Sequence, residues 1–264
     1  MGYTLIKLWR GDCLERMKDI PDASIDMILC DLPYGTTKNK WDSVLSLSRL
    51  WEEYRRIIKD KGCIALFAQT PFDKVLGTSA IDLLKYEWIW EKPMATGFLN
   101  SQFAPMKCHE NILIFSKSAA CYVKDKNNAM VYNPQMAEGK PYTSTQGMTS
   151  TNYDTKWAKK TTTVNNGTRY PRDVQKFAHD KEKYHPTQKP VALCEYLIKT
   201  YTNEGDIVLD NCMGSGSTGV ACVNTHRSFI GIELNTEYYQ IAKERIRNAK
   251  TMVRRLPHTD EGVT

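Results

Sequence analysis

Short apolar runs alternate with helical patterns along most of this 264-residue chain. The run Ile25–Cys30 has the length and composition of a buried strand, whereas Ser43–Lys59 repeats its apolar residues at helical spacing. This alternation favours an α/β fold, a mostly parallel twisted sheet with helices on both faces. The same pattern predicts strands at Thr4–Leu8, Cys63–Ala68, Tyr86–Trp90, Asn111–Ser116, Asp206–Leu209 and Ser228–Ile232, and helices at Phe72–Leu84, Val191–Tyr201, Ser217–Asn224 and Thr236–Asn248.

The alternation stops between Ser116 and Lys189, and this stretch carries the chain's whole positive excess. It holds 13 Lys and Arg against 6 Asp and Glu, whereas the remainder holds 23 against 24. We therefore predict a basic insert, 117–182, within a larger domain of residues 1–116 and 183–249, followed by a tail, 250–264. A solvated loop and a surface for nucleic-acid phosphates both fit this charge. The candidate contacts to nucleic acid are Lys156, Lys159, Lys160, Arg169, Arg172 and Lys176.

A glycine-rich loop follows the predicted strand that ends near Asp210. Its residues Gly214 and Gly216 let the backbone approach a ligand closely. Glu233 ends the next strand, 23 residues after Asp210, where a carboxylate can accept hydrogen bonds from ribose hydroxyls. A tight turn without a ligand is the alternative. The loop and the acid together favour a nucleoside cofactor, and S-adenosylmethionine is favoured over a dinucleotide because the Gly-x-Gly-x-x-Gly spacing is not met.

A second loop, Asp31-Leu32-Pro33-Tyr34, follows the buried strand Ile25–Cys30. Pro33 restricts the backbone, so the Asp31 carboxylate and the Leu32 carbonyl are held in fixed directions. Two neighbouring acceptors suit a primary amine, and Tyr34 offers a ring on which a planar base can stack. An ordinary strand-to-turn exit explains the same four residues, so this loop taken alone leaves both interpretations open.

Four motifs together resemble those of the DNA amino-methyltransferases. Asp31–Tyr34 resembles their Asp-Pro-Pro-Tyr catalytic loop, and Asp210–Thr218 resembles their Asp-Pro-Phe-x-Gly-Ser-Gly-Thr cofactor loop. His185–Pro190 reads His-Pro-Thr-Gln-Lys-Pro, a motif of the β group of this family, and Gly11–Glu15 is similar to the family's Gly-Asp-Cys/Ala segment. The order, with the catalytic loop before the insert and the cofactor loop after it, is also that of the β group. The resemblance implies a Rossmann-like methyltransferase fold with circularly permuted motifs, in which the insert recognises the target.

The resemblance also implies the residues of the site. Asp31, Leu32, Pro33 and Tyr34 are the expected catalytic residues. Among cofactor contacts, Glu233 is expected to bind the ribose and Asp12 the adenine amine. The sequence departs from the family at Leu32 and at Asn211-Cys212, and the second change removes a Phe that often covers the methionine portion. The expected cofactor-binding residues are Asp12, Cys13, Asp31, Thr187, Lys189, Asp210, Asn211, Met213, Gly214, Ser215, Gly216, Ser217 and Glu233.

The predicted reaction is methyl transfer from S-adenosylmethionine to the exocyclic N6 amine of an adenine in a specific DNA sequence. An adenine inside a duplex is inaccessible, so it must flip out of the stack. The alternatives are a cytosine N4 DNA methyltransferase, an RNA adenine methyltransferase, and a catalytically silent nucleic-acid-binding regulator. In the family, a Ser at the Asp31 position more often accompanies cytosine, so Asp31 favours adenine.

The remaining expectations concern partners and compartment. Double-stranded DNA is the expected partner, a homodimer is expected by resemblance, and the sequence does not reveal a restriction partner. None of the eight cysteines forms a Cys-x-x-Cys pair, which favours reduced thiols, no metal site and a cytoplasmic enzyme. No apolar run approaches the roughly 18 residues of a membrane-spanning helix.

Overall fold

The computed structural model describes residues 4–33, 45–120, 126–146 and 161–255. The chain divides into two compact units, one made of 1–133 and 173–264 and the other of 134–172. The second unit is shorter than the predicted insert, 117–182, because residues 117–133 and 173–182 belong to the first unit. Within the described residues, no helix is long and apolar enough to cross a membrane.

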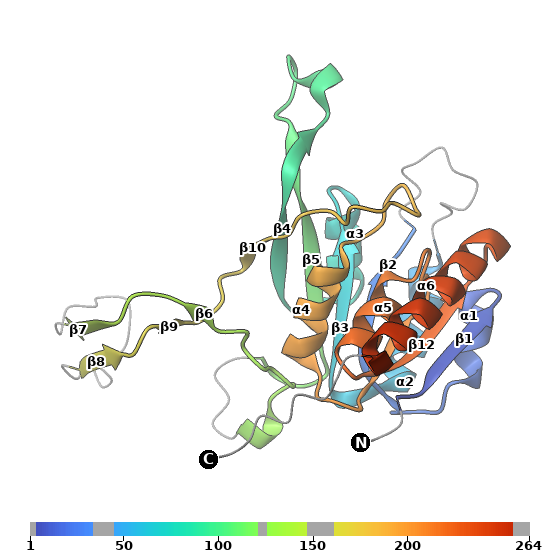
Figure 1. Ribbon diagram of the computed structural model, residues 1–264, viewed down its shortest axis with the longest axis horizontal. Helices are drawn as coiled ribbons and strands as arrows, with labels where there is room; N and C mark the ends of the chain where they lie inside the picture. Colours follow the sequence, from blue (N-terminus) through green and yellow to red (C-terminus); the bar gives the residue numbers. More distant parts are fainter. Residues whose placement is uncertain (1–3, 34–44, 121–125, 147–160, 256–264) are drawn as a thin grey trace. The chain divides into compact units, whose positions relative to one another are not determined.

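The first unit is built on an eight-stranded sheet (Figure 1). Its strand order is β1-β12-β11-β2-β3-β5-β4-β10, and only β5 runs antiparallel to its neighbours. The predicted α/β fold with a mostly parallel sheet is therefore confirmed. In chain order the strands are β1 Ile6–Arg10, β2 Ile25–Asp31, β3 Ile58–Ala68, β4 Leu84–Thr96, β5 Lys107–Phe115, β10 Val174–Lys176, β11 Ile207–Asp210 and β12 Ser228–Glu233.

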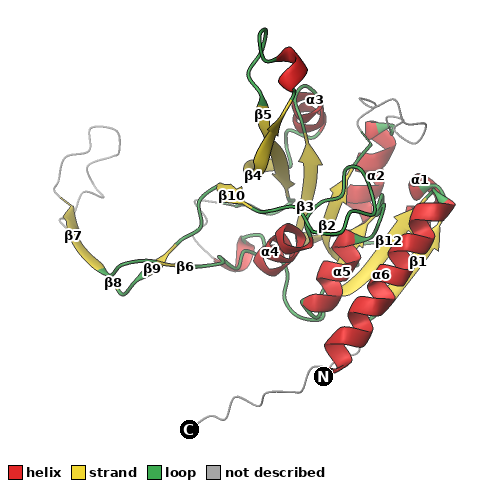
Figure 2. Cartoon of the chain, turned by 45° about the horizontal axis from the view of Figure 1, so that its top comes forward, coloured by secondary structure: helices red, strands yellow, loops and turns green. Residues whose placement is uncertain are grey.

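Helices cover both faces of this sheet (Figures 1 and 2). Side chains alternate along β2, so Ile28 lies in the core beneath α1, α2 and α3, while Met27 and Leu29 lie in the core beneath α4, α5 and α6. Both faces are thus buried, as expected for parallel strands. The helices are α1 Cys13–Arg16, α2 Leu47–Ile57, α3 Phe72–Ser79, α4 Val191–Tyr201, α5 Ser217–Asn224 and α6 Thr236–Arg255, and short 3-10 turns lie at Met17–Asp19, Phe98–Asn100 and Lys126–Asn128.

Three helices end at other residues than predicted. Helix α2 ends at Ile57, not Lys59, because Ile58 is already extended and pairs with Ile25 of β2. Helix α3 ends at Ser79, since the backbone of Ala80 leaves the helical region and Leu84 begins β4. Helix α6 continues to Arg255 into the predicted tail, because Ala249 and Val253 pack against the core.

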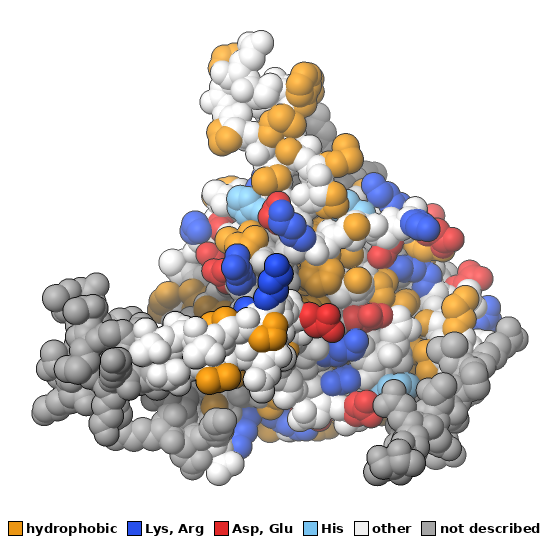
Figure 3. Space-filling view, turned by 60° about the vertical axis from the view of Figure 1, so that its left-hand side comes forward, with side chains coloured by type: hydrophobic (Ala, Val, Ile, Leu, Met, Phe, Trp, Pro, Cys, Tyr) orange, Lys and Arg blue, Asp and Glu red, His pale blue; other side chains and the backbone are white. Residues whose placement is uncertain are grey.

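The strands β4 and β5 form an antiparallel hairpin whose end extends beyond the packed core of the unit. Its end, residues 93–106, contains no charged residue. Phe98, Leu99 and Phe103 are 75%, 93% and 87% exposed there. Figure 3 shows hydrophobic side chains gathered on the part that projects at the top of the view. An exposed apolar cluster of this kind is typical of an interaction surface.

The second unit contains two small antiparallel pairs. β6 (Ala137–Glu138) pairs with β9 (Thr168–Arg169), and β7 (Tyr142–Gln146) pairs with β8 (Thr161–Asn165). Arg169 donates hydrogen bonds to the Asn165 side chain and to the Lys140 carbonyl, and its guanidinium lies 4.6 Å from the centre of the Tyr142 ring. Among the described residues of this unit, polar contacts are present and no residue belongs to a hydrophobic core cluster.

Candidate functional site

A cavity of about 620 Å³ opens at the carboxyl ends of the parallel strands. Strands β1 and β12 pair in parallel with Arg10 opposite Glu233, so the segment after β1 lies beside the end of β12. The Gly11 amide donates to the Glu233 carbonyl at 3.0 Å and fixes this junction. The described residues that sequence analysis assigned to the site and that line the cavity are Asp12, Cys13, Asp31, Leu32, Pro33, Thr187, Lys189, Asp210, Asn211, Met213, Gly214, Ser215, Ser217 and Glu233.

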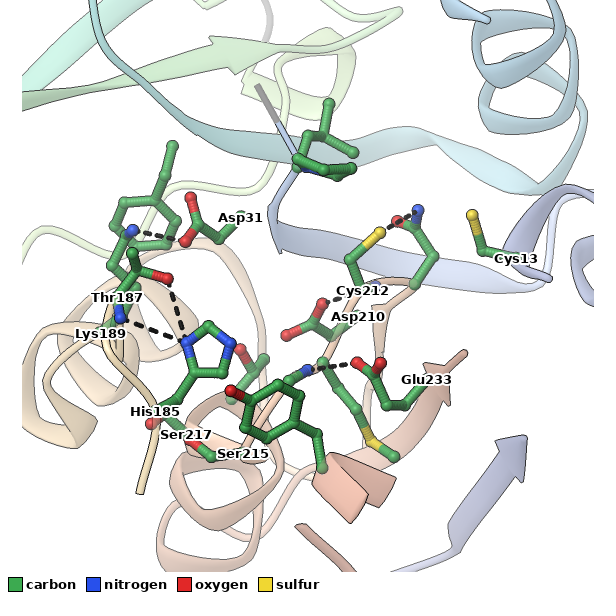
Figure 4. A pocket seen from close by; sticks show the side chains of 18 of the residues that line it. Cys13, Asp31, His185, Thr187, Lys189, Asp210, Cys212, Ser215, Ser217 and Glu233 are labelled. Atoms are coloured by element: carbon green, nitrogen blue, oxygen red, sulfur yellow. Dashed lines mark hydrogen bonds and ion pairs between the residues drawn. The ribbon is translucent and has the colours of Figure 1, made fainter. Parts of the chain in front are cut away.

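The glycine loop has the backbone that its sequence predicts. Gly214 and Gly216 adopt φ values of +49° and +82°, which residues other than glycine rarely adopt. The Gly214 amide donates to Glu233 Oε2 at 2.8 Å, and the Asn235 amide donates to Oε1 at 2.7 Å. Burial raises the pKa of Glu233, although the backbone donors act against this. The loop and the acid of β12 are thus one connected wall of the cavity (Figure 4).

Asp210 and Asn211 hold the beginning of this loop in place. The Cys212 amide donates to Asp210 Oδ1 at 3.1 Å, and burial raises the pKa of Asp210 to about 7. Asn211 Oδ1 accepts a 2.6 Å hydrogen bond from the buried Tyr54 hydroxyl. The Asn211 side chain is therefore anchored to the buried Tyr54, and the residue also lines the cavity.

Asp12 lines the cavity on the segment that lies beside Glu233. Its Oδ1 accepts the Leu14 amide at 2.8 Å and caps helix α1, which begins at Cys13. This side chain–backbone cap fixes the direction of the Asp12 carboxylate. Asp12 and Glu233 thereby present two carboxylates to the same cavity from neighbouring strand ends.

Asp31 lies at the end of β2, where its side chain is 24% exposed. Its Oδ2 is 2.5 Å from Lys189 Nζ, which also lies 3.3 Å from Glu110 Oε2. Sequence analysis placed Lys189 among the cofactor-binding residues, whereas in the structure its ammonium pairs with these two protein carboxylates. Figure 4 shows Lys189 directed toward Asp31.

His185 and Thr187 form a compact turn before Lys189. His185 Nδ1 lies 3.2 Å from the Thr187 amide and 3.1 Å from its hydroxyl. The His185 ring packs on Tyr238 with 4.3 Å between ring centres. Burial and the nearby Lys189 charge lower the pKa of His185 to about 4, so this ring is neutral at pH 7. These contacts fix the turn that precedes Lys189, whose ammonium lies beside Asp31.

Some expected site residues are not brought to the cavity. Gly216 shapes the loop but does not line the cavity. Tyr34 and the candidate DNA contacts Lys156, Lys159 and Lys160 lie outside the described residues. Of the other DNA candidates, Arg169 and Arg172 belong to the second unit, and Lys176 on β10 is 77% exposed and 2.9 Å from Glu91.

Several cavity residues were missed by sequence analysis. Phe67 and Gln69 come from the end of β3 and the loop after it, Glu110 from β5, and Tyr238 from α6. None lies in a recognisable motif, and Glu110 stands among other polar residues of β5, such as His109 and Asn111, so its charge gave no distinct signal. The described residues contain no cluster of His, Cys, Asp or Glu suited to a metal ion.

The chemistry of the cavity fits S-adenosylmethionine. Ser217 Oγ is buried, lines the cavity and has no hydrogen-bond partner among the described residues, so a polar ligand group would satisfy it. Glu233 and Asp12 offer acceptors for hydroxyl and amine groups. The positive φ of Gly214 and Gly216 leaves the loop backbone accessible.

Comparison with known proteins identifies the family. A family model described as DNA methylase matches residues 25–244. The type II methyltransferase M.HpaI of Haemophilus parainfluenzae is 32% identical over 254 residues, covering 89% of this chain and 72% of that protein. The DNA adenine methyltransferase YhdJ of Escherichia coli (strain K12) is 30% identical over 253 residues, covering 89% and 81%.

A solved structure gives the same result. The M1.HpyAVI–SAM complex aligns with a TM-score of 0.61 and 27% identity, covering 92% of this chain and 99% of that one. The matched family region contains both the Asp31 loop and the glycine loop that meet at the cavity. This chain therefore belongs to the N6/N4 DNA methylase family and is a DNA methyltransferase that uses S-adenosylmethionine.

Proposed function

We propose that this methyltransferase modifies the N6 amine of an adenine flipped out of double-stranded DNA. The observation that carries this proposal is the meeting of Asp31 and Leu32 with the glycine loop and Glu233 in one cavity. The two proposed acceptors of the target amine therefore line the same cavity as the loop and the carboxylate that are proposed to bind the nucleoside. The similarity to a named DNA adenine methyltransferase supports adenine as the base.

The proposed catalytic role of Asp31 is to accept one N–H of the target amine while the Leu32 carbonyl accepts the other. The amine lone pair is delocalised into the ring, and two acceptors favour the pyramidal nitrogen on which that lone pair is available. Bound S-adenosylmethionine supplies an electrophilic methyl group. Positive charge then develops on nitrogen, and the ionised Asp31 stabilises it. The stacking role of Tyr34 stays a proposal from the sequence.

The proposed cofactor contacts follow the walls of the cavity. Glu233 accepts hydrogen bonds from the ribose hydroxyls through the lone pairs that Gly214 and Asn235 leave available. Asp12 binds the adenine amine, and Ser217 offers its unpartnered hydroxyl to the methionine portion. Lys189 is bound to Asp31, so Thr187 and the loop amides are better placed for the methionine carboxylate than Lys189 is.

The test is transfer of a labelled methyl group from S-adenosylmethionine to unmethylated bacterial genomic DNA, followed by digestion to nucleosides. The expected product is N6-methyldeoxyadenosine. Label in N4-methyldeoxycytidine would support the cytosine alternative, and label only in added RNA would support the RNA alternative. The Asp31→Asn variant, in which Lys189 keeps Glu110 as partner, is expected to lose transfer while its affinity for S-adenosylmethionine remains.

We further propose that the protein acts as a homodimer in the cytoplasm. The apolar end of the β4–β5 hairpin, with exposed Phe98, Leu99 and Phe103, supports a protein contact, since protein interfaces have apolar centres.

The free thiols among the described cysteines support a reducing compartment, as proposed for the cytoplasm. The dimer is tested separately. Sedimentation equilibrium of the wild type and of the triple Ser variant at these three positions tests the dimer, which only the wild type is expected to form.

A further inference from the structure

A chain of four charged side chains runs along the wall of the cavity, from β2 to the β4–β5 hairpin. Asp31 pairs with Lys189, and Lys189 pairs in turn with Glu110. Glu110 Oε1 lies 2.5 Å from Lys92 Nζ of β4 and accepts the Gln69 amide at 2.6 Å. The charges alternate along the chain, so its formal sum is zero.

This chain is shielded from water. The side chains of Lys189, Glu110 and Lys92 are 8%, 5% and 16% exposed. Burial by itself would raise the pKa of Glu110 and lower that of Lys189, but the opposite charges on each side outweigh burial and shift both in the reverse direction. Both groups therefore stay ionised at neutral pH. Charges that lie so close in a partly dry site act strongly on one another.

We propose that Glu110 is a positioning residue for methyl transfer: it shares Lys189 with Asp31 and balances the lysine charge next to the nitrogen that is methylated. This inference rests on the proposed role of Asp31 as the acceptor of the target amine. Glu110 lines the cavity but acts through Lys189.

The charge balance matters because the target nitrogen becomes positive during transfer. Without the Glu110 charge, Lys189 and Lys92 leave the group with a net charge of +1, which opposes that change. Lys189 would also bind Asp31 alone and compete with the amine for its oxygens. The Glu110→Gln variant keeps the shape and one acceptor oxygen, so it removes the charge with little change in packing. We expect it to slow methyl transfer roughly 10- to 100-fold.

The experiment measures single-turnover methyl transfer from S-adenosylmethionine to unmethylated genomic DNA, together with cofactor affinity by calorimetry. E110Q should lower the rate and leave the cofactor affinity within about twofold of wild type. The matched control is Glu87→Gln, the same change at an exposed position of the neighbouring strand β4. An E110Q rate equal to that of E87Q would overturn the proposal.

A second substitution separates charge from structure. Lys92 forms an ion pair with Glu110, so E110Q combined with Lys92→Met restores a net charge of zero. The double variant should transfer methyl groups at least about threefold faster than E110Q, because the charge is balanced again although Lys189 is no longer shared. A purely structural role predicts a rate at or below that of E110Q, which would overturn the proposal. K92M alone makes the group negative and should transfer methyl groups at least as fast as wild type. A tenfold loss in K92M would contradict the charge argument even if E110Q failed to fold.

The two proposals fail in different ways. If the wild-type protein transfers no label to DNA under conditions where it binds S-adenosylmethionine, the proposed function is wrong. If the wild type is active and Asp31→Asn is inactive, but E110Q keeps the full rate, then only the role of Glu110 is wrong.

Discussion

Gly216 is the residue at which the cofactor loop is most sensitive to a single methyl group. Its φ is +82°, and a Cβ there would lie 2.9 Å from the Cβ of Ala242. Gly205 has a similar φ of +86° but no atom within 4 Å of the added Cβ. We therefore expect Gly205→Ala to cost about 1 kcal/mol of unfolding free energy and Gly216→Ala about 1–3 kcal/mol more. Urea denaturation measures both, and equal losses would show that the Ala242 contact is unimportant.

His185 provides a prediction at the same scale because its pKa is lowered to about 4 in the folded protein. The unfolded value is about 6.5, so the unfolded chain binds more protons between these two values. His185 therefore contributes stability above pH 6.5 that is lost as the pH falls toward 4. Proton NMR of the five histidines, with His185→Gln for assignment, measures the pKa directly. A titration of His185 near 6.5 would contradict its buried neutral state.

The residues that sequence analysis found and missed differ in how their contacts arise. Asp31, Gly214 and Glu233 each follow a strand within a local motif, and parallel strands bring their carboxyl ends together. Glu110 enters the site because β5 runs antiparallel between β3 and β4, so the start of β5 lies at that same edge. Tyr238 enters through the packing of α6. Such non-local pairing leaves no local sequence signal.

At the scale of elements, the end of α2 and the unpredicted strand β10 also depend on pairing between residues far apart in the sequence. Ile57 and Ile58 continue the apolar spacing of α2, so the sequence extends the helix, but Ile58 is held by its pairing with Ile25. Strand β10, Val174–Lys176, was not predicted because it is short and lies within the polar insert. It exists because Gln175 and its neighbours pair with β4.

The packing of α6 on α5 predicts how much stability one buried side chain of α6 contributes. Ile246 is 2% exposed, and its side chain fills the space above Gly219, where a Cβ would lie 2.4 Å from Ile246 Cδ1. Ile246→Ala leaves a cavity between the two helices and should cost about 2–5 kcal/mol of unfolding free energy. Met252→Ala, on the same helix at a position that is 69% exposed, should change stability by less than about 0.5 kcal/mol. Similar losses in thermal or urea unfolding for both variants would contradict this packing.

At the scale of the whole molecule, charge divides the chain into a nearly neutral framework and a basic stretch. Residues 116–189 hold 13 Lys and Arg against 6 Asp and Glu. The structure assigns part of this charge to internal contacts, since Arg169 bonds to Asn165 and Lys176 pairs with Glu91. The proposed role of Lys156, Lys159 and Lys160 as contacts to DNA phosphates stays a prediction from the sequence, because these lysines lie outside the described residues.

This division predicts a specific salt dependence. Removing one phosphate contact reduces the slope of log K against log salt concentration by about 0.9. Replacing Lys156, Lys159 and Lys160 together by Gln should lower the slope by up to about 2.7 units, while cofactor affinity is unchanged. The matched control replaces three exposed lysines of the first unit, Lys61, Lys199 and Lys243, which removes the same net charge. Fluorescence anisotropy with unmethylated duplex DNA at several salt concentrations measures both slopes. Equal slopes in the two triple variants would mean that net charge, rather than the lysines of the insert, attracts DNA.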